Sequence, residues 1–515
     1  MKSKKRVCIT NEPLNNSPMK AQTLFYKMVF LVLFTFLLPF AGWSQWEPDF
    51  QLTTTPGSYT SDNNAWCIAA RDNKIHVVWA GSLTLTDAIL YKKSPDGGVT
   101  WNEQVLLSAI YTYSSSPAVA VSGDHVHVVW SQTVAGNNSE IYYNHSTDGG
   151  ATWIGAVSLT NSLLDSQHPV IAADGQHVYV IWEDSRDYPP NGNYTELYCK
   201  KSSDGGVNWS EDAKLTTPVE ENPGFPSIAT NNGTLHLAYS KTPFSIGQEI
   251  FYCRFSEQAG TWSEPVRLSF NDQAGVGRYP TIGATGNNVY VFWSDSRDEV
   301  DYYELYVARS QDAGETWGSE SRLTFAGDDS YGPNVAVSGD ALHLIWNEHR
   351  DGNWEIYYKN STDAGLSWST DTRLTNDASD SWYPSVALNG QSVNVVWCDN
   401  RTGEWNVFYK RNPNGNPLGL ELYEQPDLRT QEMIVVAPSP AEGLFSVQIR
   451  IDDSENNFDF QSLELANLYG EILEIRHPAP GTRNNELNIT HLPAGTYFIR
   501  INFGNQTIVK KLVKI

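Results

Sequence analysis

The chain repeats one eight-residue phrase, Ser-x-Asp-x-Gly-x-Thr-Trp, five times. A sixth, degenerate copy (Ser256 to Trp262) lacks the Asp. When this copy is included, neighbouring copies lie about 50 residues apart. Self-similarity at a fixed period indicates stacked copies of one supersecondary unit, so it fixes the architecture before any local assignment is made. The aspartates of the five complete copies are Asp96, Asp148, Asp204, Asp312 and Asp363.

Each repeat contains four short apolar segments, which we name a, b, c and d. Aligned, the repeats read Pro-x-Val/Ile-Ala, a Gly turn, Val-His-Val-Val-Trp, a polar loop, Glu-Ile-Tyr-Tyr, the Asp phrase and, six residues after its Trp, Leu-Ser/Thr. The segments are rich in β-branched and aromatic residues, lack a helical period and are bounded by Gly, Asn, Asp or Pro, which are strand signals. One repeat therefore predicts four antiparallel strands.

Four-stranded units of this length predict an all-β fold, a β-propeller. Segments a to c occur seven times, but only six copies are followed by a segment d; the last copy (384–410) has none. The missing signature, Trp46-x5-Leu52-Thr53, stands near the N-terminus instead. We therefore expect this N-terminal strand to complete the last blade and close a ring of seven blades, with a six-bladed ring as the alternative.

Composition and segment boundaries suggest an exported chain. The apolar run Met28–Trp43 is short and broken by Thr35 and Pro39, which is typical of a secretory signal rather than a membrane span, so residues 1–45 are predicted to be cleaved and no transmembrane span is expected afterwards. Residues 46–410 form the predicted propeller, 411–432 a linker, and 433–515 a small β-sandwich domain. A net charge of −24 argues against nucleic-acid binding.

The Asp phrases, placed between strands c and d, resemble the Asp boxes (bacterial neuraminidase repeats) of the sialidase superfamily. The resemblance covers about residues 46–410 and implies the propeller fold. It is weakly specific for function, because the superfamily includes sialidases, other glycosidases and propellers without catalysis.

The C-terminal segment resembles the type A sorting domain of type IX secretion cargo in Gram-negative bacteria. The resemblance rests on Pro438-x-Pro440-Ala441-x-Gly443, on Leu492-Pro493-Ala494-Gly495-x-Tyr497 and on the terminal Lys510-Lys511-Leu512-Val513. It implies that residues 433–515 engage the secretion machinery, and that the protein is secreted or reaches the outer-membrane surface.

Strand parity separates the Asp phrases from the predicted functional face. In an antiparallel a-b-c-d blade, the a–b and c–d turns lie on one side and the b–c and d–a loops on the other. The Asp phrases fall on the first side, where each Asp is expected to accept backbone N–H bonds across its turn. The variable loops, where binding residues concentrate, fall on the second side, which we name the loop face.

Four b–c loops share the pattern Trp-x-Asp/Glu-x-Arg. Two interpretations stay open: the acid–Arg pairs hold loops together, or the arginines bind a carboxylate or sulfate bidentately. The arginines are Arg186, Arg297, Arg350 and Arg401.

Arg278, followed by Tyr279-Pro280, breaks the repeat at the entry to a strand a. Under the sialidase resemblance, an Arg at this topological place belongs to a three-arginine clamp for the sialic acid carboxylate. Such an enzyme also needs a Tyr nucleophile paired with a Glu, and an Asp acid/base. Tyr302, Tyr303 and Glu304 lie near Asp295 and Asp298, but Tyr303 and Glu304 align with ordinary strand-c residues, so the catalytic residues stay unknown.

The loop face also carries aromatic residues suited to stacking on saccharides, with packing between blades as the alternative. The aromatic candidates are Tyr279, Trp354 and Trp382, together with Phe225, Tyr383 and Trp405. The leading hypothesis is an exported propeller that binds glycans or surface proteins; the alternative is an exo-α-sialidase-type glycoside hydrolase. Neither hypothesis requires a cofactor, and no metal motif is found, although Asp-rich loops such as Asp328-Asp329 leave Ca²⁺ open.

Two cysteines flank the predicted ring closure. Cys67 begins strand a of the first blade and Cys398 ends strand b of the last. Because an exported protein matures in an oxidising compartment, we hypothesise a Cys67–Cys398 disulfide that seals the ring.

Overall fold

The computed structural model describes residues 46–416, apart from short loop segments, and the strand segments within 434–514. The omitted loop segments are 55–56, 61–65, 84–85, 111, 134–137, 188–193, 217–221, 243–246, 271–274 and 299–301. The predicted signal peptide and most of the predicted linker lie outside these residues. Every regular element in the described part of the chain is a β-strand.

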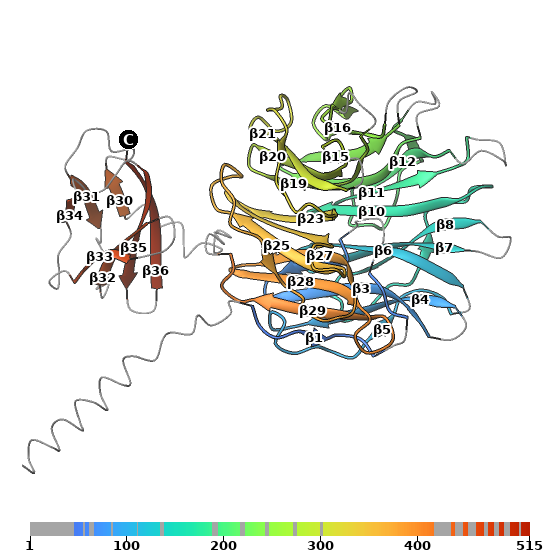
Figure 1. The fold of residues 1–515 in the computed structure, drawn as a ribbon, viewed down its shortest axis with the longest axis horizontal. Coiled ribbons are helices and arrows are strands. Elements are labelled where there is room, and N and C mark those ends of the chain that lie inside the picture. Colours follow the sequence, from blue (N-terminus) through green and yellow to red (C-terminus); the bar gives the residue numbers. More distant parts are fainter. Residues whose placement is uncertain are drawn as a thin grey trace, which may run out of the picture. The chain divides into compact units, whose positions relative to one another are not determined.

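Residues 50–412 form seven antiparallel sheets, which are the seven blades of a β-propeller (Figure 1). Blade 1 contains β2 (Ile68–Arg71), β3 (Lys74–Ser82), β4 (Asp87–Ser94) and β5 (Val105–Leu106). Blade 2 contains β6 (Tyr113–Ser122), β7 (His125–Thr133), β8 (Ser139–Ser146) and β9 (Val157–Ser158). Blade 3 contains β10 (Ser166–Asp174), β11 (His177–Asp184), β12 (Glu196–Ser202) and β13 (Ala213–Lys214).

The remaining blades repeat this order. Blade 4 contains β14 (Gly224–Asn231), β15 (Thr234–Lys241), β16 (Glu249–Ser256), β17 (Thr261–Trp262) and β18 (Val266–Arg267). Blade 5 contains β19 (Gly277–Thr285), β20 (Asn288–Asp295), β21 (Glu304–Ser310) and β22 (Ser321–Arg322). Blade 6 contains β23 (Ser330–Ser338), β24 (Ala341–Glu348), β25 (Glu355–Ser361) and β26 (Thr372–Arg373). Blade 7 contains β27 (Ser381–Asn389), β28 (Ser392–Asp399), β29 (Asn406–Asn412) and β1 (Phe50–Gln51).

The N-terminal strand closes the ring, as predicted. β1 pairs antiparallel with β29, so the first and last strands of the propeller lie side by side (Figure 1). The Leu52 N–H donates to the Val407 carbonyl at 2.8 Å, and the equivalent leucine of blade 6, Leu374, donates to Ile356 at the same distance. Seven blades are confirmed, and the six-bladed alternative is wrong.

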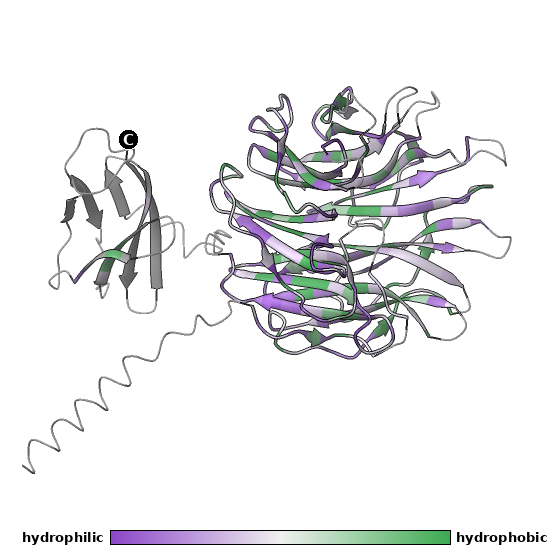
Figure 2. Cartoon of the chain, viewed as in Figure 1, coloured by the Kyte–Doolittle hydropathy of each residue, from purple (hydrophilic) through white to green (hydrophobic). Residues whose placement is uncertain are grey.

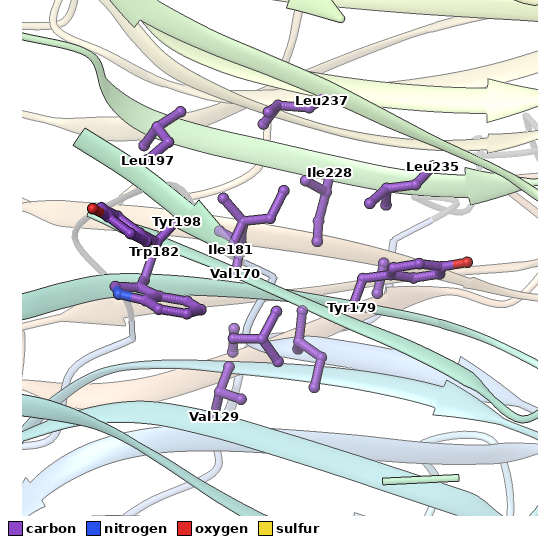
Figure 3. Packing of buried hydrophobic residues seen from close by; sticks show 14 of the residues in the cluster. Val129, Val170, Tyr179, Ile181, Trp182, Leu197, Tyr198, Ile228, Leu235 and Leu237 are labelled. Atoms are coloured by element: carbon purple, nitrogen blue, oxygen red, sulfur yellow. The ribbon is translucent and has the colours of Figure 1, made fainter. Parts of the chain in front are cut away.

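Apolar side chains fill the layers between neighbouring blades. Hydrophobic stretches run along the strands of the propeller, interrupted by hydrophilic ones (Figure 2). In the layer around blade 3, Trp182 and Ile181 lie between residues of blades 2 and 4, such as Val129 and Ile228 (Figure 3). The tryptophan that ends segment b is fully buried in six blades, which explains why it recurs at the repeat period. These residues are Trp79, Trp130, Trp182, Trp293, Trp346 and Trp397.

Each Asp phrase folds into a turn held by its own side chains. In blade 2, Asp148 accepts hydrogen bonds from the Thr152 N–H (2.8 Å) and hydroxyl (2.6 Å), and Ser146 Oγ accepts one from the Gly150 N–H (2.9 Å). These hydrogen bonds, first among them the one from the Thr152 hydroxyl, lower the pKa of Asp148. Equivalent bonds recur in the other four complete copies, for example around Asp312, and in the third copy the Asn208 amide replaces the hydroxyl donor. The Asp therefore has a structural part in the turn.

The Asp phrase also locks its blade to the preceding one. A Cβ added at Gly150 of blade 2 would lie 1.9 Å from the hydroxyl of Tyr91, which belongs to blade 1. Trp153 packs edge-on against the same tyrosine ring, with centroids 4.9 Å apart. The tyrosine hydroxyl is in turn 2.7 Å from Nδ1 of the buried His76 on its own blade. One Tyr thus links a histidine of its blade to the Gly and Trp of the next.

Trp46 takes the place of the phrase tryptophan in blade 7. Its ring packs edge-on against Tyr358 of blade 6, with centroids 5.1 Å apart, and Tyr358 is hydrogen-bonded to His343. The N-terminal segment therefore supplies both the outer strand and the interlock of the last blade.

Blades 3 and 5 make the equivalent contact with the next blade through different residues. Where the other blades carry the interlocking Tyr on strand c, blade 3 has Cys199 and blade 5 has Val307. In both blades the His of strand b is replaced by a tyrosine, Tyr179 or Tyr290. The ring of Tyr290 lies within 4 Å of an added Cβ at Gly365 of blade 6, and Tyr179 donates to Glu257 of blade 4 at 2.6 Å. In these two blades a tyrosine of strand b, in place of one on strand c, therefore contacts the next blade.

Because four histidines are buried in the propeller, we expect its free energy of unfolding to fall in acid. Desolvation is the main cause that lowers the pKa of the four histidines from 6.5, to about 3 or about 4. The four are His76, His127, His236 and His343. The unfolded chain takes up protons on them at a higher pH than the folded chain does. Each therefore contributes stability that is fully present above pH 6.5 and is lost as the pH falls, by up to about 1.4 kcal/mol per pH unit.

A single substitution checks this pH dependence. In blade 7 the place of the histidine is taken by Asn394, which accepts from the Tyr409 hydroxyl at 2.7 Å. His127→Asn should therefore fold, and between pH 6.5 and 4 its free energy of unfolding should fall less steeply than that of the parent chain. Urea midpoints measured across this pH range check the expectation, and an unchanged slope would contradict it.

The strands of residues 434–514 form two further sheets. One contains β30 (Ile434–Ala437), β31 (Ser446–Ile451) and β34 (Asn484–Asn488), in that order. The other has the order β33 (Ile472–Arg476), β32 (Phe460–Asn467), β35 (Gly495–Phe503) and β36 (Gln506–Lys514). The region is all-β, as expected; its packing as a sandwich stays a prediction.

Candidate functional site

The two faces of the propeller are assembled as strand parity predicts. On one side the Asp turns meet the a–b turns, as in the bond from Gly149 N–H to the Asp124 carbonyl at 2.7 Å. On the loop face the d–a and b–c loops meet, as in the bond from Ser381 N–H to the Trp354 carbonyl at 2.8 Å.

The inner strand of most blades carries a bulge where it enters the loop face. The residue before the strand-a proline has φ between 50° and 54° in five blades, and the register between strands a and b shifts at this point. A bulge with a left-handed non-glycine residue redirects its side chain and is retained where a function or a neighbouring contact requires it. The five residues are Ser116, His168, Phe225, Tyr279 and Tyr383.

Six aromatic side chains at and near these bulges touch in series. We name them the aromatic crescent: Phe225, Tyr279, Tyr331, Trp354, Trp382 and Tyr383. Consecutive ring centroids lie 4.4, 4.7, 6.5, 4.2 and 5.7 Å apart in this order. The crescent spans blades 4 to 7, and its rings are half-buried, with Tyr383 38% exposed.

The crescent contains five of the six aromatic residues expected from the sequence. Trp405 is separate: its carbonyl accepts the Ser58 N–H, and no ring contact joins it to the crescent in the described part of the chain. Sequence reasoning missed Tyr331, and also Tyr303, whose ring lies 5.4 Å from it. Tyr331 could have been found, because it occupies the same repeat position as Arg278 and Trp382.

The four loop arginines are bound within their own blades. Arg401 donates from Nε and from a terminal nitrogen to Asp399 at 2.8 and 2.5 Å, and from its other terminal nitrogen to Asp49 at 2.6 Å. Its guanidinium also lies 4.6 Å from the centre of the Phe408 ring. Although burial opposes the charged form, the bonds to both carboxylates raise the pKa of Arg401.

The other three arginines repeat this arrangement. Arg186 binds Asp184 and Asp212, Arg297 binds Asp295 and Glu320, and Arg350 binds Glu348 and Asp371. Each first carboxylate also accepts the indole N–H of the strand-b tryptophan two residues earlier. These contacts favour the interpretation in which the acid–Arg pairs hold the loops of one blade together.

Arg278 has a different environment. Its Nε donates to the neutral side-chain oxygen of Gln248 at 2.7 Å, and among the described residues no carboxylate pairs with it. Arg278 lies close enough to Tyr303 and Tyr331 for its charge to act on the pKa of each phenol, which burial chiefly raises. The arginine is thus beside the crescent, apart from the four paired arginines.

Acidic and histidine side chains complete this region of the loop face. His349 packs on Trp354, with ring centroids 5.0 Å apart, and its Nδ1 lies 3.1 Å from Asp328. Asp329 accepts the Tyr303 N–H at 2.8 Å, and burial raises the pKa of its carboxyl. On blade 3, Glu183 accepts the Phe225 N–H at 2.7 Å and lies 3.1 Å from His168 Nδ1.

Of the residues weighed for a sialidase-type triad, Asp295 and Glu304 lie opposite each other in the ladder of blade 5, and each carboxylate is paired with an arginine of that blade, Arg297 or Arg322. Glu304 is buried inside blade 5, where it accepts from Arg322 at 2.7 Å, as Glu355 accepts from Arg373 at 2.5 Å in blade 6. Asp298 accepts from the Tyr306 hydroxyl and from Arg322. The described residues also contain no group of three or more His, Cys, Asp or Glu arranged to hold a metal ion.

The predicted Cys67–Cys398 disulfide is not formed. Both residues are thiols, and each sulfur makes a different contact. Cys398 Sγ accepts the Thr60 N–H at 2.9 Å, at the position where Ser294 of blade 5 accepts the Gly332 N–H. Cys67 Sγ faces the Pro117 carbonyl at 3.3 Å. The ring is closed by hydrogen bonds instead.

An apolar cavity follows the axis of the ring. It has a volume of about 250 Å³ and is lined by aliphatic and small residues from strand a of all seven blades. Trp66 of blade 1 also lines it, where the other blades have proline.

Residues 435–515 match the protein family described as the secretion system C-terminal sorting domain. The chain carries a C-terminal sorting domain of the type IX secretion system. It is therefore exported to the cell surface or secreted, and its C-terminal region engages the secretion machinery. Within the residues that the structure describes, no helix has the length and apolar character needed to cross a membrane. No curated protein sequence matches the chain.

Solved structures that match the chain include a polysaccharide lyase, a sialidase and an arabinofuranosidase. An ulvan lyase bound to -[GlcA(1-4)Rha3S]- matches with a TM-score of 0.53 and 8% identity, over 70% of this chain and 95% of the lyase. A sialidase mutant of Trypanosoma rangeli that displays trans-sialidase activity matches with a TM-score of 0.42 and 10% identity, over 90% and 88% of the two chains. An α-L-arabinofuranosidase of Fusarium graminearum matches with a TM-score of 0.42 and 16% identity, over 62% and 98%. At such identities the likeness shows the propeller fold alone.

Proposed function

We propose that this exported propeller binds glycans on the loop face, with the aromatic crescent as its platform. The observation that carries the proposal is the unbroken series of half-buried rings across blades 4 to 7. Sugar rings present C–H faces that pack on aromatic faces, while their hydroxyls need polar partners at the edge. Tyrosine hydroxyls, His349 and Arg278 supply such partners beside the rings.

The arrangement favours a binding function over sialidase-type hydrolysis. A three-arginine clamp would need guanidinium groups available to one carboxylate, but four of the five candidate arginines are paired with carboxylates of their own blades. The Glu of the considered triad is engaged with Arg322. We therefore propose a non-catalytic binder; measurable turnover of a fluorogenic sialoside by the purified protein would overturn this part of the proposal.

Replacing Trp382 with alanine should reduce glycan affinity about tenfold or more, because truncating a central aromatic contact in an interface typically costs over 1 kcal/mol. Affinity electrophoresis against a panel of plant, algal and bacterial polysaccharides measures the effect. The matched control is Phe325→Ala, since Phe325 is 74% exposed and packs on Arg322, outside the crescent. Equal retardation of both variants and the parent protein would contradict the proposal.

A further inference from the structure

We propose that the crescent binds an internal segment of a long polysaccharide chain, with several consecutive sugar residues on it at once, and does not require a chain end. The inference rests on the proposed glycan-binding function and names the ligand class, an extended polymer of sugar rings. It involves no covalent step.

The first argument is the course of the crescent. Its rings come from four consecutive blades, and each touches the next, with centroid distances between 4.2 and 6.5 Å. In the described part of the chain, no ring contact joins Phe225 at one end to Trp382 or Tyr383 at the other. The rings therefore form a row that follows the circle of blades, rather than a pocket closed around one point. Such a row offers stacking contacts to several successive sugar residues.

The second argument is that both ends of the row are fixed by neighbouring blades. At the bulges, the Phe225 N–H donates to Glu183 at 2.7 Å, and the Tyr383 N–H donates to Asn347 at 3.0 Å. Each acceptor lies on strand b of the preceding blade. A platform that is fixed before the ligand arrives lowers the entropic cost of binding a flexible chain.

The third argument is the spread of polar side chains along the row. In blade 3, beside the blade 4 end, His168 Nδ1 lies 3.1 Å from Glu183. In blade 6, His349 packs on Trp354, and its Nδ1 lies 3.1 Å from Asp328. A pocket for one terminal sugar needs polar groups that converge on that sugar. These two carboxylate–histidine pairs stand three blades apart, so they can meet the hydroxyls of different sugar residues.

The axial cavity does not offer a site for a terminal sugar instead. Its described lining residues are aliphatic or small, apart from Trp66 and Thr230, and the Thr230 hydroxyl donates to the Ala173 carbonyl at 3.4 Å. A sugar placed there would lose the water around its hydroxyls without gaining hydrogen-bond partners, which is unfavourable. The glycan is therefore expected on the crescent.

The test varies chain length while the chemistry of the sugar stays constant. Titration calorimetry would be run on the purified full chain with cello-, xylo-, manno-, laminari- and galacturono-oligosaccharides of increasing length, and with their parent polymers. In the series that binds, affinity should rise with each added residue until the crescent is covered, and then level off. The longest oligosaccharide should bind on the order of 100-fold more tightly than the monosaccharide, because it stacks on more rings.

Partial hydrolysis of the parent polymer separates internal binding from chain-end binding. At equal mass, hydrolysis multiplies the chain ends and shortens the internal segments. As a competitor of the longest oligosaccharide, the intact polymer should therefore be more effective than its hydrolysate. A hydrolysate that competes better would show that chain ends are bound, and would overturn the inference.

Phe225→Ala and Trp382→Ala remove rings near opposite ends of the row, and Phe325→Ala is again the control outside it. Each of the first two should weaken binding of the long oligosaccharides about tenfold, and the two effects should multiply in the double variant, because distant sites act independently. A disaccharide covers only part of the row, so its binding should depend on one of the two rings. Melting temperatures that match the parent's show that the losses do not come from unfolding.

The remaining outcomes separate this inference from the proposed function. Trp382-dependent binding that is equally tight for a monosaccharide and its polymer would overturn the inference and leave the proposed function standing. Binding of long chains that is lost in Trp382→Ala but unchanged in Phe225→Ala would have the same meaning. Absence of Trp382-dependent binding to every oligosaccharide and polymer would overturn both.

Discussion

Replacing Gly150 with alanine is expected to destabilise the propeller by about 3 kcal/mol or more. The new Cβ would lie 1.9 Å from the hydroxyl oxygen and 2.8 Å from the adjacent ring carbon of Tyr91, so the tyrosine or the turn must move. Overpacking of this kind costs about 1–3 kcal/mol, and a left-handed alanine adds about 1–2 kcal/mol. Gly150 has φ of +78°, so both costs apply. Denaturant unfolding followed by tryptophan fluorescence measures the loss.

Gly175→Ala is the matched control for this prediction. Gly175 also has a positive φ, +59°, but an added Cβ there meets nothing within 4 Å. Its substitution should cost only the backbone strain, about 1–2 kcal/mol. Tyr91→Phe should recover part of the Gly150→Ala loss by removing the closest atom. Equal effects at Gly150 and Gly175 would show that the contact between blades does not contribute.

Removing residues 46–53 is expected to cost on the order of 5 kcal/mol or more of propeller stability. The deletion opens the ring, because these residues form the outer strand of blade 7. It exposes the cluster around Leu52, which is 2% exposed, and it removes the Trp46 ring from Tyr358. It also leaves Arg401 and Lys410 without Asp49, to which they are bound at 2.6 and 2.7 Å.

A peptide of residues 46–54 added in trans should restore part of this loss, since it supplies the same strand. Within the full chain, Leu52→Ala should cost about 2–4 kcal/mol, whereas Phe50→Ala should change little because Phe50 is 48% exposed. The unfolding midpoint of each variant is the measurement. A deletion variant that melts with the parent chain would show that the ring is held closed without the N-terminal strand.

The sequence by itself determined the blade and the closure of the ring. Strand positions, the turn of the Asp phrase and the place of Leu52 all follow from residues within one repeat, because antiparallel neighbours joined by short turns pair locally. The N-terminal strand pairs with a strand from the other end of the propeller sequence. It carries the same signature, Trp-x5-Leu-Thr, so its place could still be predicted from the repeat. The sorting domain was likewise identified from local motifs.

Only the tertiary structure decided which side chains of the loop face are available. The sequence placed Arg278 and the four loop arginines on one face. It did not show that four of them are paired with carboxylates and that Arg278 donates to Gln248 instead. It paired Cys67 with Cys398 by position, whereas each sulfur faces a different backbone group. It did not reveal the crescent, whose rings come from four blades. Several of these contacts join residues far apart in the chain, 30 positions for Arg278 and Gln248 and 338 for Thr60 and Cys398. Side-chain direction at a bulge, which the repeat period does not encode, decides which rings of the crescent meet.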